Sequence, residues 1–175
     1  ASNPKICKQI HVPLQSGSTR LLQSMKRGYT KENFLNRCAK IRLLCPEATI
    51  STDIIVGFPG ESEEDFEETM DVLEKVKFEQ VFSFKYSPRP HTEAQHFIDV
   101  VPDEVASERL SRLQARHFEM LAAQMDDQLG KVHKVYFDEL KPNGRVSGRT
   151  DDGRLVFAEG SEELLGKIED VRITR

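Results

Sequence analysis

The sequence predicts an α/β protein, in which units of a parallel sheet or (β/α) barrel precede a small antiparallel β-barrel. Over residues 1–101, short apolar strand patterns alternate with helical patterns, as in βα units. One long helical pattern covers residues 102–128. Short strand patterns separated by glycine-containing turns fill residues 129–175, which is typical of a small barrel. We therefore expect a parallel α/β region, either a sheet or a barrel, then a linking helix and a small β-barrel.

The central βα unit spans residues 50–66. Its β-branched run at residues 50–56 is typical of a strand buried on both faces. A turn at residues 57–60, with two glycines and a proline, ends this strand. Ser62 is placed to cap the next helix, with Asp65 three residues later as in a capping box. The unit is therefore predicted to be a strand, a tight turn and a helix.

Ligands of parallel α/β folds bind over the carboxyl ends of the strands, so Asp53 and the turn with Glu61 are candidate site residues. Carboxylates crowd the start of the helix after this turn, at Glu61, Glu63, Glu64 and Asp65. They would repel a phosphate, so the turn favours a neutral or cationic ligand. The alternative is that this segment is only a good turn before a good helix.

Two further helices are expected before the central strand. Alternation over residues 6–14 predicts a strand that ends at the polar segment QSGS, residues 15–18. Ser18 is placed to cap a short helix, which we expect to close at residues 26–28 with two cations and a glycine. Thr30 is placed to cap a second, longer helix.

The aromatic-rich residues 80–86 predict a third strand, and the two prolines in residues 87–92 predict an ordered loop after it. QSGS, the central turn and this loop each follow a strand. Because the carboxyl ends of parallel strands meet at one edge of a sheet, we expect the three segments to form one ligand site.

The last two regions are a long helix and short strands. The predicted apolar stripe of the helix is Leu110, Leu113, Phe118, Leu121 and Met125. Glycine-containing turns are predicted at residues 142–144 and 151–153. Arginines beside these turns are placed to contact phosphates, although the region as a whole is charge-balanced.

The net charge of -4 hides an asymmetry. Residues 1–45 carry nine Lys and Arg against one acidic residue, whereas residues 46–80 carry two against eleven. The basic segment is either a nucleic-acid surface or the solvent face of two helices. No apolar run approaches the roughly 20 residues that span a bilayer, so we expect no membrane partner.

The cysteines indicate a reducing compartment. Cys7, Cys38 and Cys45 are odd in number and irregularly spaced, which favours free thiols and a cytoplasmic location. No CxxC or CxxxCxxC pattern occurs, so we expect no metal or iron–sulfur ligands in this sequence. The five histidines are scattered, and we assign no catalytic residue.

Three long motifs resemble those of a known family. HVPLQSGSTRLLQSMKRGYT, STDIIVGFPGESEEDFEETM and FSFKYSPRPHT occur in the order and spacing found in radical SAM methylthiotransferases. The sequence is most similar to the bacterial type that methylthiolates isopentenyladenosine in tRNA, beside the anticodon. Residues 128–175 resemble the TRAM domain, which follows the barrel in that family and is thought to hold the RNA.

The resemblance implies a partly closed (β/α) barrel that binds S-adenosyl-L-methionine (SAM) across the carboxyl ends of its strands, beside a 4Fe-4S cluster. Residues 1–101 would be the later half of this barrel, and residues 129–175 a TRAM-like barrel, complete or lacking its last strand. The implied SAM-binding residues are Gln15, Ser16, Gly17, Ser18, Asp53, Gly57, Pro59, Gly60, Glu61, Tyr86, Ser87 and Arg89. A carboxylate such as Glu61 would suit the cationic sulfonium group. The candidate RNA contacts are Arg27, Lys131, Lys134, Arg145, Arg149 and Arg154.

One part of the family pattern is missing. The CxxxCxxC motif of the family precedes the region that this sequence resembles, and no cysteine here matches a cluster ligand. We therefore expect the C-terminal part of such an enzyme, inactive alone and prone to self-association through an open sheet edge. The alternatives are an RNA-binding module and a methylthiotransferase that acts on an aspartate of a ribosomal protein.

Overall fold

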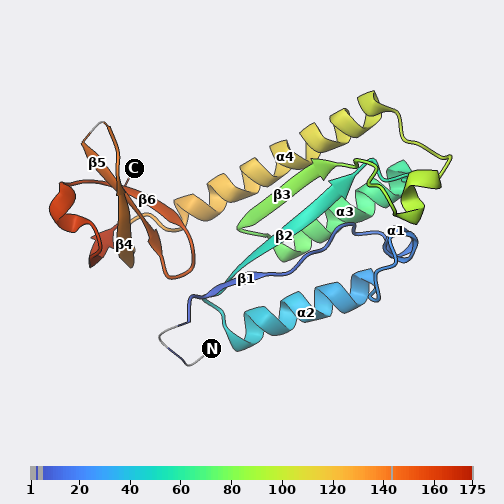
Figure 1. Cartoon of the computed structure of the whole chain (residues 1–175). Helices are drawn as coiled ribbons and strands as arrows, with labels where there is room; N and C mark the ends of the chain where they lie inside the picture. The colour runs from blue at the N-terminus through green and yellow to red at the C-terminus, as the bar shows by residue number, and fades with distance from the viewer. Residues whose placement is uncertain (1–2, 4–5, 143, 175) are drawn as a thin grey trace.

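The computed structural model describes residue 3, residues 6–142 and residues 144–174 of the chain. Its strands form one parallel and one antiparallel sheet, and a long helix connects the first sheet to the second (Figure 1). This confirms the predicted fold class, an α/β region followed by a small antiparallel β region. Asn143, in the turn predicted at residues 142–144, lies outside the described residues.

The parallel sheet has three strands in the order β1 (Gln9–His11), β2 (Thr49–Val56) and β3 (Gln80–Lys85). β1 is shorter than the strand predicted over residues 6–14. The regular ladder ends after Val12, whose N–H donates to Ser51 O at 2.8 Å. The Thr52 hydroxyl then bonds to the residues on both sides of Pro13. It accepts from Leu14 N at 3.0 Å and donates to Val12 O at 2.8 Å.

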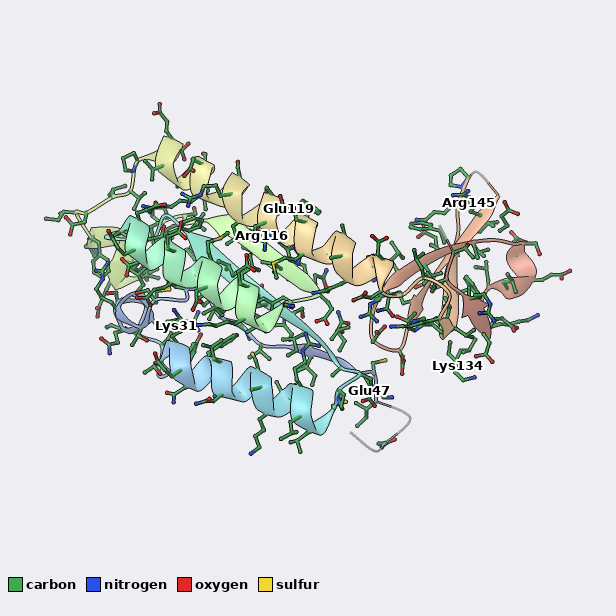
Figure 2. The ribbon with its side chains drawn as sticks, turned by 180° about the vertical axis from the view of Figure 1, so that it is seen from behind. Lys31, Glu47, Arg116, Glu119, Lys134 and Arg145 are labelled. Carbon is green, nitrogen blue, oxygen red and sulfur yellow. The ribbon has the colours of Figure 1, made fainter. Side chains whose placement is uncertain are left out.

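Three helices cover one face of this sheet and leave the other face open. They are α2 (Lys31–Leu44), α3 (Glu63–Val76) and α4 (Asp103–Asp126). Figure 1 looks onto the open face, and Figure 2 shows the helices in front of the strands. Right-handed connections between parallel strands place successive helices on the same side. The core between helices and sheet includes the fully buried Leu14, Phe34, Ile50, Ile54, Phe66, Leu73 and Phe78.

The helix starts agree with the predicted caps. Ser18 caps the short helix α1 (Thr19–Ser24), accepting from Leu21 N. Thr30 begins α2 in a capping box with Asn33, and Ser62 begins α3 in a capping box with Asp65. Each cap satisfies amides that the first helical turn leaves unpaired.

The end of α1 differs from the prediction. Met25 is the C-cap, and Lys26, not Gly28, takes the left-handed conformation with φ 57°. Lys26 N donates to Gln23 O and Arg27 N donates to Leu22 O, as in a Schellman motif. These two bonds compensate for placing a side chain in a conformation that favours glycine.

The buried stripe of α4 also differs from the prediction. Leu113 is buried as expected, but Phe118 is 67% exposed. The buried positions include the polar Arg109 and His117, because each finds a hydrogen-bond partner in the core. Burial lowers the pKa of His117, whose Nε2 lies 3.2 Å from Phe78 O, so this histidine is a neutral core residue. Among the described residues, no helix is long and apolar enough to cross a bilayer.

The second sheet is antiparallel, in the order β6-β5-β4-β7. Its strands are β4 (Val132–Leu140), β5 (Arg145–Thr150), β6 (Leu155–Glu159) and β7 (Ile168–Arg172). Short 3₁₀ helices lie at Glu93–His96 and Glu162–Leu164. Val135, Phe137 and Val146 form a small separate core on the inner face of this curled sheet.

The turn between β5 and β6 touches the amino-terminal edge of the parallel sheet. Lys8 N donates to Asp151 O at 2.9 Å, and the Thr49 hydroxyl donates to Asp152 O at 2.5 Å. The antiparallel sheet therefore contacts the end of the parallel sheet opposite to the carboxyl ends of its strands.

Candidate functional site

A cavity of about 900 Å³ lies at the carboxyl ends of the three parallel strands. It is lined by five of the predicted residues, Gln15, Asp53, Tyr86, Ser87 and Arg89, and by Arg27. They come from segments far apart in the sequence, most of which leave or follow a strand. The structure therefore brings Gln15, strand β2 and the loop after β3 to one cavity. Of the central turn, which was predicted to join them, the described lining includes Phe58 but not Gly57, Pro59 or Gly60.

The backbone of Gln15 and strand β2 hold the floor of the cavity. Gln15 has φ 69°, and its N–H donates to Asp53 O at 2.8 Å while its carbonyl accepts from Ile55 N at 2.9 Å. This isolated bridge continues the parallel pairing beyond Pro13. It places Gln15 beside Asp53, and both residues line the cavity.

His11 was not predicted as a site residue. Its Nε2 lies 3.1 Å from Asp53 Oδ2 and its Nδ1 lies 3.0 Å from Ser51 Oγ, on the open face of the sheet. The three side chains share this face because residues two apart along a strand point the same way. The sequence did not show which residues of β1 and β2 lie side by side. The two-residue alternation within a strand says only which side chains of that strand share a face.

Tyr86 forms part of the cavity wall. Its ring packs edge-on against Phe58, with centroids 5.1 Å apart, and Phe58 in turn packs against Phe97. The Tyr86 hydroxyl is buried without a hydrogen-bond partner among the described residues. A buried hydroxyl is normally satisfied, so this oxygen is available to a ligand group in the cavity.

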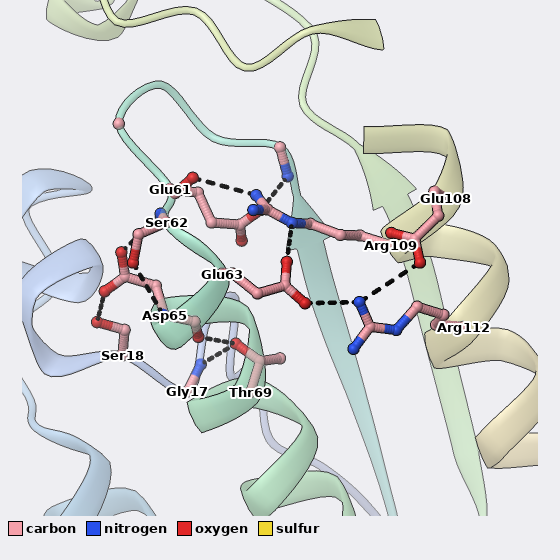
Figure 3. Close-up of polar contacts among 12 residues, drawn as sticks. Gly17, Ser18, Glu61, Ser62, Glu63, Asp65, Thr69, Glu108, Arg109 and Arg112 are labelled. Atoms are coloured by element: carbon pink, nitrogen blue, oxygen red, sulfur yellow. Dashed lines mark hydrogen bonds and ion pairs between the residues drawn. The ribbon is translucent and has the colours of Figure 1, made fainter. Parts of the chain in front are cut away.

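The other predicted residues of QSGS have structural contacts instead (Figure 3). Gly17 N donates to Thr69 Oγ1 at 2.9 Å, and Ser18 Oγ donates to Asp65 Oδ1 at 2.6 Å. Ser16 is buried next to them, with its hydroxyl accepting from Ser18 N. Residues 16–18 therefore join the start of α1 to α3 and do not line the cavity.

Asp65 offers a test of this joint. Burial opposes its charged form, but hydrogen bonds from Arg20, Ser18 and Ser62 outweigh burial and lower the pKa of Asp65 to about 2. A carboxyl whose pKa is lower in the folded than in the unfolded protein stabilises the fold at any pH above its unfolded-state pKa. This stability is lost as the pH falls through its folded-state pKa. Asp65→Asn is expected to lower the free energy of unfolding by about 2 kcal/mol at neutral pH, with less loss near pH 2. Urea unfolding at both pH values measures this.

Asp71→Asn is the matched control, because Asp71 lies on the same helix, has a 39% exposed side chain and pairs with Lys31 and Lys75. Its expected loss is below about 1 kcal/mol. An Asp65→Asn variant as stable as wild type at neutral pH would contradict the assignment.

Gly57, Pro59, Gly60 and Glu61 lie beside the cavity but do not line it. The Glu61 side chain is 1% exposed, and its Oε2 accepts from Gly57 N at 2.7 Å and from Arg109 Nη1 at 2.9 Å (Figure 3). Burial raises the pKa of Glu61, whereas the Gly57 amide and the Arg109 guanidinium favour its charged form. Glu61 thus points toward α4, away from the position in which we expected it to meet a cationic ligand, because a buried carboxylate requires its counter-ion.

The predicted RNA contacts do not form one surface. Arg27 lies at the cavity, while the others lie on or beside the antiparallel sheet. There, Lys134 and Arg145 lie at opposite ends of the sheet (Figure 2). The side chain of Arg149 donates to Gly153 O, and that of Arg154 pairs with Asp152.

The cysteines Cys7, Cys38 and Cys45 are free thiols. Across the part of the chain that the structure describes, no three His, Cys, Asp or Glu side chains gather as metal ligands would. Burial raises the pKa of the Cys38 thiol to about 11, so this cysteine is an inert core residue.

Comparison with known proteins identifies both regions. The Radical SAM superfamily model matches residues 2–73, and the TRAM domain model matches residues 127–175. Over 175 residues, the chain is 78% identical to the tRNA-2-methylthio-N(6)-dimethylallyladenosine synthase of Sulfurovum sp. (strain NBC37-1) and 62% identical to that of a Nitratiruptor species. These alignments cover all of this chain but only 41% and 40% of the relatives. The motifs around the cavity, the TRAM match and the identity along the whole chain agree: the chain carries a radical SAM region followed by a TRAM region, and it is similar over its whole length to part of these tRNA methylthiotransferases.

Proposed function

We propose that this chain is the part of a tRNA methylthiotransferase that orients SAM and contacts the RNA, with isopentenyladenosine beside the anticodon as the substrate. The observation that carries the proposal is the cavity of about 900 Å³ in which three separate strand ends meet. The names of the relatives support tRNA as the substrate class.

The residues of the cavity fit SAM. Asp53 supplies a carboxylate for a cationic ligand, and the unpartnered Tyr86 hydroxyl supplies a hydrogen-bonding group. Phe58, Phe84 and Tyr86 supply aromatic walls against which a base can pack. When bound, SAM supplies the radical chemistry of this family, and these side chains hold it in one orientation.

The described residues do not fit a 4Fe-4S cluster. Such clusters need cysteine thiolates, and two of the three cysteines, Cys38 and Cys45, are buried apart from the cavity lining. The described residues therefore supply no site for such a cluster.

The role of Asp53 can be tested with two ligands that differ in charge. In the full-length protein, Asp53→Asn is expected to weaken SAM binding about tenfold, because a charged partner of the sulfonium is lost. Binding of S-adenosylhomocysteine, a neutral thioether, should change little. Calorimetry measures both affinities, and Glu104→Gln, an exposed acid at the start of α4, is the control. Equal losses for the two ligands would show that Asp53 acts by shape and not by charge.

Two other functions remain distinguishable. If the chain is an RNA-binding module alone, it should bind an anticodon stem-loop with a steep salt dependence and no SAM affinity. If the substrate is an aspartate of a ribosomal protein, tRNA from cells lacking the full-length protein should keep its methylthio group in mass spectrometry. A cytoplasmic location and self-association through the sheet edge stay predictions, and analytical ultracentrifugation tests the second.

A further inference from the structure

A second cavity, of about 290 Å³, lies where the end of α4 meets the inner face of the antiparallel sheet. Its walls are largely apolar, with Leu129, Leu155 and Val156 among them. His133 and Arg154 add two polar side chains from different segments of the sheet. Among the described residues, this cavity shares no lining residue with the cavity at the carboxyl ends of the parallel strands.

Both polar side chains place an unpaired nitrogen there. His133 Nε2 and Arg154 Nε are buried and have no hydrogen-bond partner among the described residues. The Arg154 guanidinium does not move freely, because its Nη1 pairs with Asp152, which is itself buried and bonded to the Thr150 hydroxyl. A buried donor without an acceptor costs stability, so a fixed one beside an open space indicates a ligand or a water.

The chemistry of the site narrows the ligand. Arginine only donates, so the ligand must present an acceptor at one edge. Most of the remaining wall is apolar, although Gln128, Thr150 and Thr174 also line it, and the volume lies at the lower limit of ligand pockets, which suits one small flat molecule. Asp126 also lines the cavity and would repel a phosphate. A nucleobase, with apolar faces and a carbonyl or ring nitrogen at its edge, meets all three conditions.

We propose that this cavity receives one unstacked nucleobase of the RNA, read at its edge by His133 and Arg154. RNA-binding modules commonly take single-stranded bases in this way. The inference rests on the proposed RNA substrate and changes the role of Arg154 from a phosphate contact to a base contact. Lys134, the next residue after His133, is exposed on the opposite face of β4, where it pairs with Asp170 and does not line the cavity.

The test compares these two neighbours in the full-length protein, by fluorescence anisotropy with anticodon stem-loops. An RNA series with one abasic nucleotide per variant is titrated against wild type, His133→Phe and Lys134→Ala. One abasic position is expected to weaken wild-type binding about tenfold, and the same position should have little further effect in His133→Phe. His133→Phe should keep the wild-type salt slope, whereas Lys134→Ala should weaken all RNAs alike and reduce the slope by about one.

Arg154→Lys is the second variant, because it keeps a cation near Asp152 while removing Nε. A thermal melt of this variant shows whether the antiparallel sheet still folds. Equal affinity for every abasic RNA in the wild type would overturn the proposal, as would His133→Phe and Arg154→Lys proteins that fold and keep wild-type affinity; the cavity would then hold only water. If the wild type does not bind the stem-loop at all, the RNA substrate itself fails, and this inference fails with it.

Discussion

Replacing Arg109 with methionine is expected to destabilise the protein by about 3–5 kcal/mol at neutral pH. The side chains of Arg109 and Glu61 are 6% and 1% exposed, and their contact is 2.9 Å long. Removing the guanidinium leaves the Glu61 carboxylate buried, with the Gly57 amide as its one remaining hydrogen-bond partner among the described residues. Such a charge cannot regain the solvation that it loses on folding. Urea unfolding of the variant and of wild type measures the difference.

The same variant should show a characteristic pH dependence. Burial already raises the pKa of Glu61, and loss of Arg109 raises it further. A carboxyl with a raised folded pKa binds more protons when folded, so stability increases as pH falls through that pKa toward the ordinary value of 4.5. The deficit of Arg109→Met should therefore shrink in mild acid. A deficit that does not depend on pH would indicate lost packing instead of an uncompensated charge.

Arg112→Met is the matched control, three residues further along α4. Arg112 is 39% exposed and pairs with Glu63, Glu67 and Glu108 at the surface. Exposed pairs contribute little, so the expected loss is below about 1 kcal/mol. If both variants lose equal stability, the buried pair has no special role in holding the turn at residues 57–61 against α4.

Gly17→Ala is expected to destabilise the protein by about 3 kcal/mol and to displace the QSGS segment. A Cβ on Gly17 would lie 2.4 Å from Glu68 O and 2.5 Å from Thr69 Cα. Both atoms belong to the backbone of α3, which cannot yield as a flexible side chain can. The bond from Gly17 N to Thr69 Oγ1 would be lost, and Gln15 at the cavity should shift with it. Chemical denaturation and SAM calorimetry in the full-length protein measure both effects.

Gly28→Ala is the control for that prediction. A Cβ on Gly28 would meet nothing within 4 Å, and its φ lies outside the region that favours glycine. The expected result is unchanged stability or a gain of about 0.4–1 kcal/mol, because alanine restricts the unfolded chain. A Gly17→Ala protein as stable as Gly28→Ala would show that α3 and the QSGS segment separate easily.

Part of the candidate site was predictable and part was not. Asp53, Gln15 and Tyr86 could be expected near one another, because parallel βα units place their strand ends at one edge. Glu61 could not be placed, because its partner Arg109 lies on a helix that no local pattern connects to the turn. His11 was missed for a related reason, since its neighbours Ser51 and Asp53 come from the adjacent strand.

Local chemistry within a few residues determined the helix starts, the turns and the order of strands and helices. Ser18, Thr30 and Ser62 cap their helices because each N-cap bonds to amides only three residues away. Tertiary packing alone decided which face of α4 is buried, where Phe118 lies in solvent and His117 in the core. Burial depends on what lies opposite a side chain, and those partners are set by contacts between residues far apart in the chain.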